Sequence, residues 1–277
     1  MKDLKSKIQI NYLSFTKKEK LIADYLLDHA QEAKNMTISE LATACGVAES
    51  TIFLFSKKLK LSGFKELTVL LANDHNKLLL DSVDGNEDTQ ALVKKVFDSN
   101  IRALEDTAQL IDYKNLTNAV QLLTNSNKIV FFALGGSTPI ALDAYHKFLR
   151  TPLDVEFNLE YHMQLLKAGK LNENSCAFII SHSGKNPDIL RLVELLKKNK
   201  VPIISITSFD NTPLVKKSDV VFLTPTEELD FKNAGIYTRR VSQLVLIDIL
   251  FTLTISSDPE KTISHLEQFR HALPYTK

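Results

Sequence analysis

Two hydrophobic patterns divide the chain. In residues 1–80 the apolar positions recur every three or four residues, which is typical of short amphipathic helices. After about residue 112, continuous apolar runs alternate with amphipathic segments, as they do where helices cover a sheet of buried strands. Residues 81–88, DSVDGNED, are acidic and lack apolar anchors, which indicates a junction. We therefore predict an all-α domain over residues 1–80, a linker and docking helix over 81–111, and an α/β domain over 112–277.

The α/β part repeats one unit three times. Its segments KIVFFALGGSTPIALDAYHKFL, CAFIISHSGKNPDILRLVELL and VPIISITSFDNTPLVKKSDVVFL each read as an apolar strand, a loop of small residues and a helix. A proline stands at the start of each helix, at Pro139, Pro187 and Pro213, where it fixes the backbone without removing a needed hydrogen bond. Continuous apolar strands joined by helices predict a doubly wound parallel sheet.

Capping patterns locate helix starts in the N-terminal part. Thr16 with Glu19, and Thr37 with Glu40, have the spacing of a capping box. The helix after the first box should turn one apolar stripe inward, made of Leu21, Ile22, Tyr25 and Leu26. Further along, residues 89–111 predict a long amphipathic helix that docks on the α/β part through Leu92, Val96, Asn100, Ile101 and Leu104.

The segment ISELATACGVAESTIFLFSKKLKL predicts two helices joined by a tight turn. The first should end near Ala44 and the second begin near Glu49, and Gly46 suits the left-handed backbone between them. Helical spacing turns one face of the second helix toward the core through Ile52, Phe55 and Leu59. The residues left outside are Ser50, Thr51, Phe53, Leu54, Lys57 and Lys58.

The outward face of this second helix has a composition suited to DNA. Hydroxyl residues at its N-terminal end, followed one turn later by lysines, suit a helix that enters the major groove. A small helical bundle with a solvated face is the alternative. Because the segment has lysines and no arginine, phosphate neutralisation is favoured over bidentate reading of guanine. The candidate DNA-contacting residues are Ser50, Thr51, Leu54, Lys57, Lys58 and Lys65.

Hydroxyl residues gather in the loops that follow the predicted strands. Ligands of doubly wound sheets bind at the carboxyl ends of the strands, where these loops meet. Helix N-termini supply unpaired N–H groups and a partial positive charge there, so hydroxyls added to them favour a phosphate site. The candidate residues are Ser137, Thr138, Ser181 and Ser183, with Gly136 and Gly184 for close backbone approach; Gly135, Thr207 and Ser208 lie in the same loops.

Other chemistry is poorly supported by the sequence. Cys45 and Cys176 lie far apart without metal-ligand spacing, so we expect two buried thiols, no metal and a reducing compartment. Neither GxGxxG nor a Walker loop occurs, so no nucleotide cofactor is expected. SHSGKN does not match the GxSxG of a hydrolase, and His182 should project away from Ser181 and Ser183 on an extended segment. We therefore expect no nucleophilic catalysis.

Charge and hydropathy limit the partners. The chain has 44% hydrophobic and 24% charged residues and a net charge of +1, so any DNA contact must be local. The N-terminus lacks an apolar signal segment. The apolar run over 241–255 is shorter than a membrane span and carries Gln243 and Asp248, so it predicts a buried helix. We expect a cytoplasmic protein without a membrane partner.

Two segments resemble known families. The run from ISELATACGVAESTIF through LSGFKEL is similar to the helix-turn-helix of RpiR-type transcription regulators. The α/β part, through FALGGSTPIALDAYHKFLR, IISHSGKNPDIL, SFDNTPLVKKSDVVFL and RRVSQLVLIDILF, resembles the sugar isomerase (SIS) domain. The second resemblance implies that the hydroxyls of Ser137, Thr138, Ser181 and Ser183 line a sugar-phosphate pocket.

The chain departs from these families at several positions. Ala48 stands where a capping serine is usual, and Leu54 where an arginine is usual, so an operator sequence cannot be carried over. Asn186 stands where a threonine is usual in the sugar-phosphate pocket; we expect it to cap its helix and, through its amide, to donate a hydrogen bond to the phosphosugar. Arg239 replaces the serine of an SRxxQ-like segment that continues with Arg240 and Gln243; both arginines suit structural or subunit contacts.

The resemblances together imply a DNA-binding regulator of carbohydrate metabolism that responds to a sugar phosphate and works as a homodimer or homotetramer on an operator. The alternative is a SIS-type sugar-phosphate isomerase or related lyase. Such an enzyme needs a general base near the phosphate. Candidates are Glu160, His162, Glu227 and Glu228, which have no distinctive spacing. The helix-turn-helix favours the regulator, because an isomerase gains nothing from it.

Overall fold

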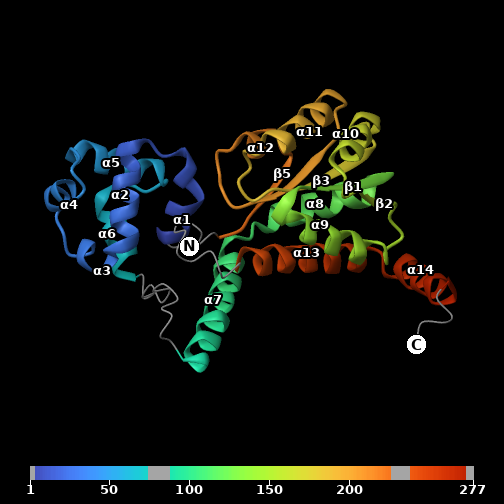
Figure 1. Ribbon diagram of the computed structural model, residues 1–277, viewed down its shortest axis with the longest axis horizontal. Coiled ribbons are helices and arrows are strands. Elements are labelled where there is room, and N and C mark those ends of the chain that lie inside the picture. The colour runs from blue at the N-terminus through green and yellow to red at the C-terminus, as the bar shows by residue number, and fades with distance from the viewer. Residues whose placement is uncertain (1–3, 74–87, 226–237, 273–277) are drawn as a thin grey trace. The chain divides into compact units, whose positions relative to one another are not determined.

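The computed structural model describes residues 4–73, 88–225 and 238–272, and the chain divides into two compact units (Figure 1). One comprises residues 1–109 with 225–238, and the other 110–224 with 239–277. The first unit is helical in its described residues. Its elements are α1 (Leu4–Asn11), η1 (Tyr12–Ser14), α2 (Lys17–Asp28), α3 (Ala30–Ala33), α4 (Ile38–Ala44), α5 (Glu49–Lys58), α6 (Phe64–Asn73) and α7 (Thr89–Leu110).

Local signals set the helix starts of this unit as predicted. Both capping boxes form: the backbone N–H of Thr16 donates to Glu19 at 2.7 Å, and that of Thr37 to Glu40 at 2.7 Å. Gly46 has φ +64° between α4 and α5, which confirms the left-handed turn.

The core of the helical unit contains most of the predicted inward residues. Ile22, Leu26, Ile52, Phe55 and Leu59 are buried together.

One inward prediction for this unit is wrong. Leu21 is exposed on α2, where Ile22, Ala23 and Leu26 form the buried side of the helix. On α7, Ala103 and Thr107 are buried, and docking of the α7 stripe on the α/β part stays a prediction.

The second unit is a parallel sheet between two layers of helices. Its strands have the order β2-β1-β3-β4-β5, all parallel, which confirms the doubly wound α/β fold. Its elements are α8 (Tyr113–Asn125), β1 (Lys128–Ala133), η2 (Gly135–Ser137), α9 (Thr138–Phe148), β2 (Val155–Phe157), α10 (Tyr161–Lys170), β3 (Ser175–Ile180), α11 (Pro187–Lys198), β4 (Ile203–Thr207), α12 (Pro213–Lys217), β5 (Val220–Leu223), α13 (Thr238–Ser257) and α14 (Pro259–Ala272).

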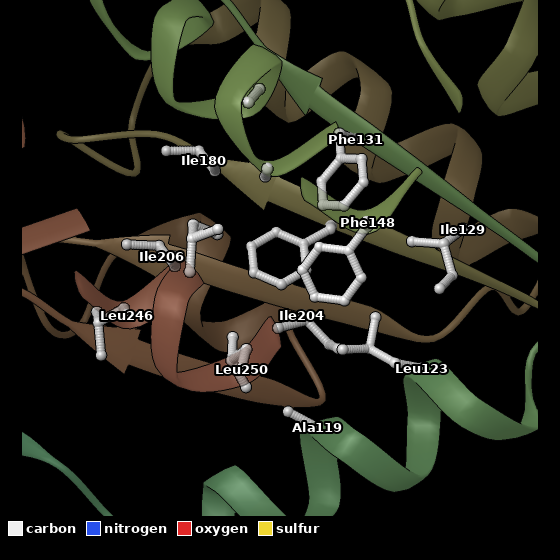
Figure 2. Packing of buried hydrophobic residues seen from close by; sticks show 14 of the residues in the cluster. Ala119, Leu123, Ile129, Phe131, Phe148, Ile180, Ile204, Ile206, Leu246 and Leu250 are labelled. Carbon is white, nitrogen blue, oxygen red and sulfur yellow. The ribbon is translucent and has the colours of Figure 1, made fainter. Parts of the chain in front are cut away.

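Alternate residues of each central strand enter opposite cores. Phe131 and Phe178 face the layer of α8, α9 and α13, where Phe131 lies 5.8 Å from Phe148, ring centroid to ring centroid (Figure 2). Phe132 and Ile179 face the layer of α10, α11 and α12. Burial on both faces explains why the strands read as continuous apolar runs.

Helix α13 is longer than the apolar run predicted. Its stretch Arg240–Ser257 has a mean hydropathy of 1.4 and is long enough to cross a membrane, so the sequence argument from length was wrong. Leu246, Ile247 and Leu250 nevertheless pack in the sheet core, and Asp248 pairs with Lys147 at 2.6 Å. These contacts are those of a core helix in an α/β domain.

Candidate functional site

The loops after β1 and β3 begin side by side at the point where the strand order reverses. Ala133 and Ile180, the last residues of the two strands, are register partners in the sheet. The chain leaves β1 toward β2 on one side and enters β3 on the other, so their carboxyl ends form the topological switch point. Ligands of open α/β sheets bind at this position.

Two serine hydroxyls at this point are not used by the fold. The side chains of Ser137 and Ser181 are only 8% and 5% exposed, and their hydroxyls have no hydrogen-bond partner within the part of the chain that the structure describes. Ser137 is the N-cap residue of α9, yet its side chain makes no capping hydrogen bond. Because a hydroxyl forms a bond when one is available, both are ready to bond an incoming group.

The neighbouring candidates are placed differently. Ser183 is half-buried, and its Oγ accepts a 3.2 Å hydrogen bond from the backbone N–H of Lys185. Thr138 is half-buried in the first turn of α9, and Gly136 is exposed beside it in η2. The predicted residues of the two loops therefore lie at one edge of the sheet.

Asn186 caps α11 as predicted. Its Oδ1 accepts from the backbone N–H groups of Asp188 at 2.9 Å and Ile189 at 3.1 Å. Pro187 has no N–H, so the cap satisfies the first two free donors of this helix. The N-terminus of α9, which lacks a side-chain cap, is consequently the more available end for an anion.

Gly184 locks the β3 loop against the next loop. Its φ is +60°, and a Cβ there would lie 2.4 Å from Thr212 Oγ1 and 3.1 Å from Thr207 Oγ1. The Gly184 carbonyl also accepts from the backbone N–H of Leu214 at 3.3 Å. Only glycine satisfies both the backbone and the packing, so its role is to hold this loop in place. Gly135 shares the positive φ, at +56°, but has open space around it.

His182 is a hydrogen-bonding residue, as expected, and not a base for the serines. Its Nδ1 lies 2.8 Å from Ser208 Oγ, which lies 2.8 Å from Thr224 Oγ1. Thr207 Oγ1 donates to the His182 carbonyl at 3.0 Å. Thr207 and Ser208, which follow their strand in the same set of loops, are fully buried, and their hydroxyls are used in these contacts.

The candidate bases of an isomerase have little support in the described residues. Glu160 is the N-cap of α10 and accepts from the backbone N–H groups of His162 at 2.9 Å and Met163 at 2.8 Å. These two donors hold the pKa of Glu160 below its usual range. His162 is exposed, and Glu227 and Glu228 lie outside the described residues.

The two cysteine thiols are buried, and the side chains that could bind a metal are not clustered in the described residues. Burial raises the pKa of the Cys45 thiol to about 11 and that of Cys176 to about 12, so both stay protonated. Within residues 4–73, 88–225 and 238–272, no three His, Cys, Asp or Glu side chains lie close enough to hold a metal ion.

Sequence reasoning missed two residues that shape the site. Gln164 of α10 is 1% exposed, and its amide donates to the Ala133 carbonyl at 3.1 Å and the Asn158 carbonyl at 2.9 Å, which joins the ends of β1 and β2. Thr212 caps α12 and packs against Gly184. A threonine directly before Pro213 is a helix-start signal, but nothing local marks Gln164.

The SRxxQ-like segment lies at the start of α13. Gln243 is 2% exposed, and its Nε2 has no hydrogen-bond partner among the described residues. Arg240 is half-buried, and the side chain of Arg239 lies outside the described residues. The structural or subunit role expected for the arginines stays a prediction.

Helix α5 presents most of its predicted outward face. Leu54 is 62% exposed, Ser50 and Lys57 are exposed, and Thr51 is half-buried. Lys57 Nζ lies 5.5 Å from the centre of the Phe53 ring. The uncapped start of this helix is confirmed, since its N-cap Ala48 makes no side-chain hydrogen bond. Lys65 is exposed on α6.

Lys58 does not point outward as predicted. Its Nζ donates to the Ser14 carbonyl and to Glu19 Oε2, both at 2.8 Å, and lies 5.3 Å from the centre of the Phe15 ring. Burial alone would raise the pKa of Glu19, but the hydrogen bonds from Lys58 and Thr16 outweigh it and lower that pKa. Lys58 therefore joins α5 to α2, and its charge is used within the unit.

Comparison with known proteins agrees with both units. Residues 2–77 match the family described as helix-turn-helix domain, rpiR family, and residues 122–253 match the SIS domain. An uncharacterized HTH-type transcriptional regulator of Caldanaerobacter subterraneus subsp. tengcongensis is 31% identical over 100% of this chain and 99% of its own. The HTH-type transcriptional regulator HexR of Pseudomonas aeruginosa is 28% identical over 100% and 98%.

A solved structure shares the whole fold. The NanR protein of Vibrio vulnificus, complexed with ManNAc-6P, has a TM-score of 0.63 and 23% identity over 99% of each chain. A helix-turn-helix domain followed by a SIS domain defines a class of transcriptional regulators in which a DNA-binding domain is joined to a ligand-binding domain. Within that class, the chain belongs to the RpiR family of HTH-type transcriptional regulators.

Proposed function

We propose that this regulator binds a sugar phosphate at the switch point of its SIS domain and that the bound ligand alters its affinity for DNA. The observation that carries the proposal is the pair of unused hydroxyls of Ser137 and Ser181, held at adjoining strand ends before the uncapped start of α9. Hydroxyls and a helix N-terminus bind a dianionic ester without needing cations. The pathway expected is one of carbohydrate metabolism.

The proposal assigns a role to each part of the chain. Residues 1–80 read DNA, residues 81–111 connect, and residues 112–277 sense the ligand. The partner of α5 is a double-stranded operator, contacted by Ser50, Thr51, Leu54 and Lys57, with Lys65 of α6 beside them. Such a regulator works in the cytoplasm. Two reading heads on half-sites about 34 Å apart, or a multiple of it, need at least a homodimer.

The bound sugar phosphate is an effector and not a substrate in this proposal. Glu160, the candidate carboxylate of the enzyme alternative that lies within the described residues, is occupied as a helix cap with a lowered pKa. A general base works best when its pKa lies near the operating pH. Incubation of the purified chain with aldose and ketose phosphates, followed by NMR, should show no interconversion; turnover would favour the isomerase.

A paired ligand screen tests the proposal. Each phosphosugar is compared with its unphosphorylated sugar by thermal shift, because a ligand at 100 times its dissociation constant adds about 2.7 kcal/mol to stability. At least one phosphosugar should stabilise the chain and its sugar should not. Equal shifts from both members of every pair would contradict a phosphate site.

A further inference from the structure

Helix α5 has the position of the second helix of a helix-turn-helix. The chain bends by 98° between α4 and α5, and the four residues 45–48 join the two helices around the left-handed Gly46. In a DNA-binding helix-turn-helix, two helices at about 90–120° are joined by three or four residues, and the second helix lies in the major groove. The side chains on the outward face of α5 are therefore those that meet base edges.

The core of the helical unit fixes which face of α5 points outward. Ile52 and Leu59 are buried in that core. At about 100° per residue, Ser50, Leu54 and Lys57 fall within about 60° of one another on the opposite side of the helix. All three side chains are exposed, and Leu54 is 62% exposed. The outward direction of Leu54 thus follows from the helical unit by itself.

The other exposed apolar residue of α5 is partly used within the unit. Phe53 lies at the margin of the outward face and is 45% exposed. Lys57 Nζ lies 5.5 Å from the centre of its ring, and a Cβ on Gly63 would lie 3.6 Å from a ring carbon. Leu54 lies outside the core of this unit. A single exposed leucine is ordinary on a protein surface, but this one stands at the middle of the face that meets base edges.

We propose that Leu54 contacts the 5-methyl group of a thymine in the major groove and thereby selects a T·A pair. Leucine has no hydrogen-bond donor or acceptor, so it cannot bond the nitrogen and oxygen atoms of base edges. Among the four bases, thymine alone presents a methyl group in the major groove. Any other base would place polar atoms against Leu54 without a partner, which is unfavourable. The inference rests on the proposed contact between α5 and an operator, and it names the base that this contact selects.

The residues beside Leu54 on the outward face suit the same placement. Ser50, one turn nearer the start of α5, has a hydroxyl that can bond a base edge or a phosphate. Lys57, one turn nearer the end, supplies a positive charge for the backbone. Glu49, the acidic residue in the first turn, falls about 100° from Ser50 and so lies off this face. The outward face therefore offers a hydroxyl, an apolar group and a cation in order along the helix.

Removal of single thymine methyl groups tests the contact on the full chain. Selection from a pool of duplexes with a randomised centre gives the preferred sequence, and each thymine in it is then replaced by uracil. Uracil lacks the methyl group and keeps the hydrogen-bonding edge. At the position read by Leu54, uracil should weaken binding about fourfold in fluorescence anisotropy, the factor that corresponds to about 0.8 kcal/mol for one buried carbon. A sequence in which no thymine can be distinguished from uracil overturns the proposal.

A leucine-to-alanine pair of variants assigns the methyl contact to its residue. In Leu54→Ala, uracil and thymine at that position should bind equally well, because the side chain that touches the methyl group is gone. The matched control is Leu21→Ala, which truncates a leucine of α2 that is 51% exposed and should keep the full fourfold difference. A fourfold difference that persists in Leu54→Ala would place the methyl contact on another residue and overturns the proposal.

A change of base preference provides a second test at the same position. Arginine bonds the O6 and N7 atoms of guanine, so Leu54→Arg should change the selected base from thymine to guanine there and leave the rest of the preferred sequence unchanged. A Leu54→Arg variant that selects the same sequence as the wild type would show that position 54 reads no base, and it overturns the proposal.

The selection also separates this inference from the proposed function. A preferred sequence whose thymines are all replaceable by uracil leaves the operator contact of α5 standing and removes only the methyl contact of Leu54. Recovery of no preferred sequence overturns both. The phosphosugar thermal shift depends on neither result, because the α5 variants leave the loops after β1 and β3 unchanged.

Discussion

The two left-handed glycines of the site loops provide a matched test of the loop packing. Alanine at Gly135 or Gly184 must adopt a positive φ, which costs roughly 1 to 2 kcal/mol in either place. At Gly135 the added Cβ meets nothing within 4 Å. At Gly184 it would lie 2.4 Å from Thr212 Oγ1, so the neighbouring loop must shift, and overpacking of this kind costs about 1 to 3 kcal/mol more.

Gly184→Ala should therefore destabilise the α/β unit by about 2 to 5 kcal/mol, and Gly135→Ala by about 1 to 2 kcal/mol. Urea unfolding of the full chain gives the free-energy differences, and hydrogen exchange in β3 and β4 reports on the α/β unit itself. Equal destabilisation by the two substitutions would refute the close packing of Gly184 against Thr212. A Gly184→Ala variant as stable as the wild type would refute the strain argument as well.

Three further predictions concern the helix ends and the DNA-reading face. Lys57→Ala should lower by about one unit the slope of log affinity against log salt concentration for a random-sequence duplex, because one phosphate contact is lost. Lys58→Ala should leave this slope unchanged and lower the free energy of unfolding instead. Fluorescence anisotropy at several salt concentrations separates the two variants, and the reverse result would contradict the assignment. Ala48→Ser should add the missing cap of α5 and stabilise the helical unit by about 1 kcal/mol in urea unfolding; no gain would mean that the helix start is already satisfied. The Glu160 cap has a folded pKa below its unfolded value, so its contribution is present above the unfolded pKa and is lost as pH falls through the folded pKa. The stability difference between the wild type and Glu160→Gln should accordingly vanish in acid, and a constant difference would refute the charged cap.

Local signals in the sequence explain the elements that were predicted correctly. Pro139 and Pro187 lie at helix starts, and both capping boxes form at the positions that their spacing predicts. Gly46 adopts the left-handed backbone that the turn before α5 needs, a conformation that favours glycine. Strand β2, with three residues at Val155–Phe157, gave no comparable signal because it is too short to show a pattern.

The features that the sequence did not predict depend on contacts between distant residues. Helical spacing predicts that Lys57 and Lys58 both point outward. Only the fold shows that Lys58 donates a hydrogen bond to Glu19, which is 39 residues away in sequence. Ser208 follows its strand just as Ser181 does, but its hydroxyl bonds His182 and is buried. Loop position alone therefore predicts where a hydroxyl lies, and not whether the fold already uses it.

Helix α7 shows a third limit. The apolar stripe was visible in the sequence, but periodicity indicates only that one face seeks burial and does not say against which surface. The small residues Ala103 and Thr107, which gave no hydrophobic signal strong enough to compete, occupy the buried side.

Calorimetric titration of a phosphosugar into Ser181→Ala tests the central claim most directly. The Ser181 hydroxyl has no partner among the described residues, so its removal should leave the fold intact and remove one charge-assisted hydrogen bond to the ligand, worth about 1.5 to 3 kcal/mol. The account predicts binding weaker by about 10- to 150-fold, with wild-type affinity in Ser126→Ala, whose hydroxyl bonds the Leu122 carbonyl just before β1. Unchanged affinity in Ser181→Ala would contradict the phosphate site.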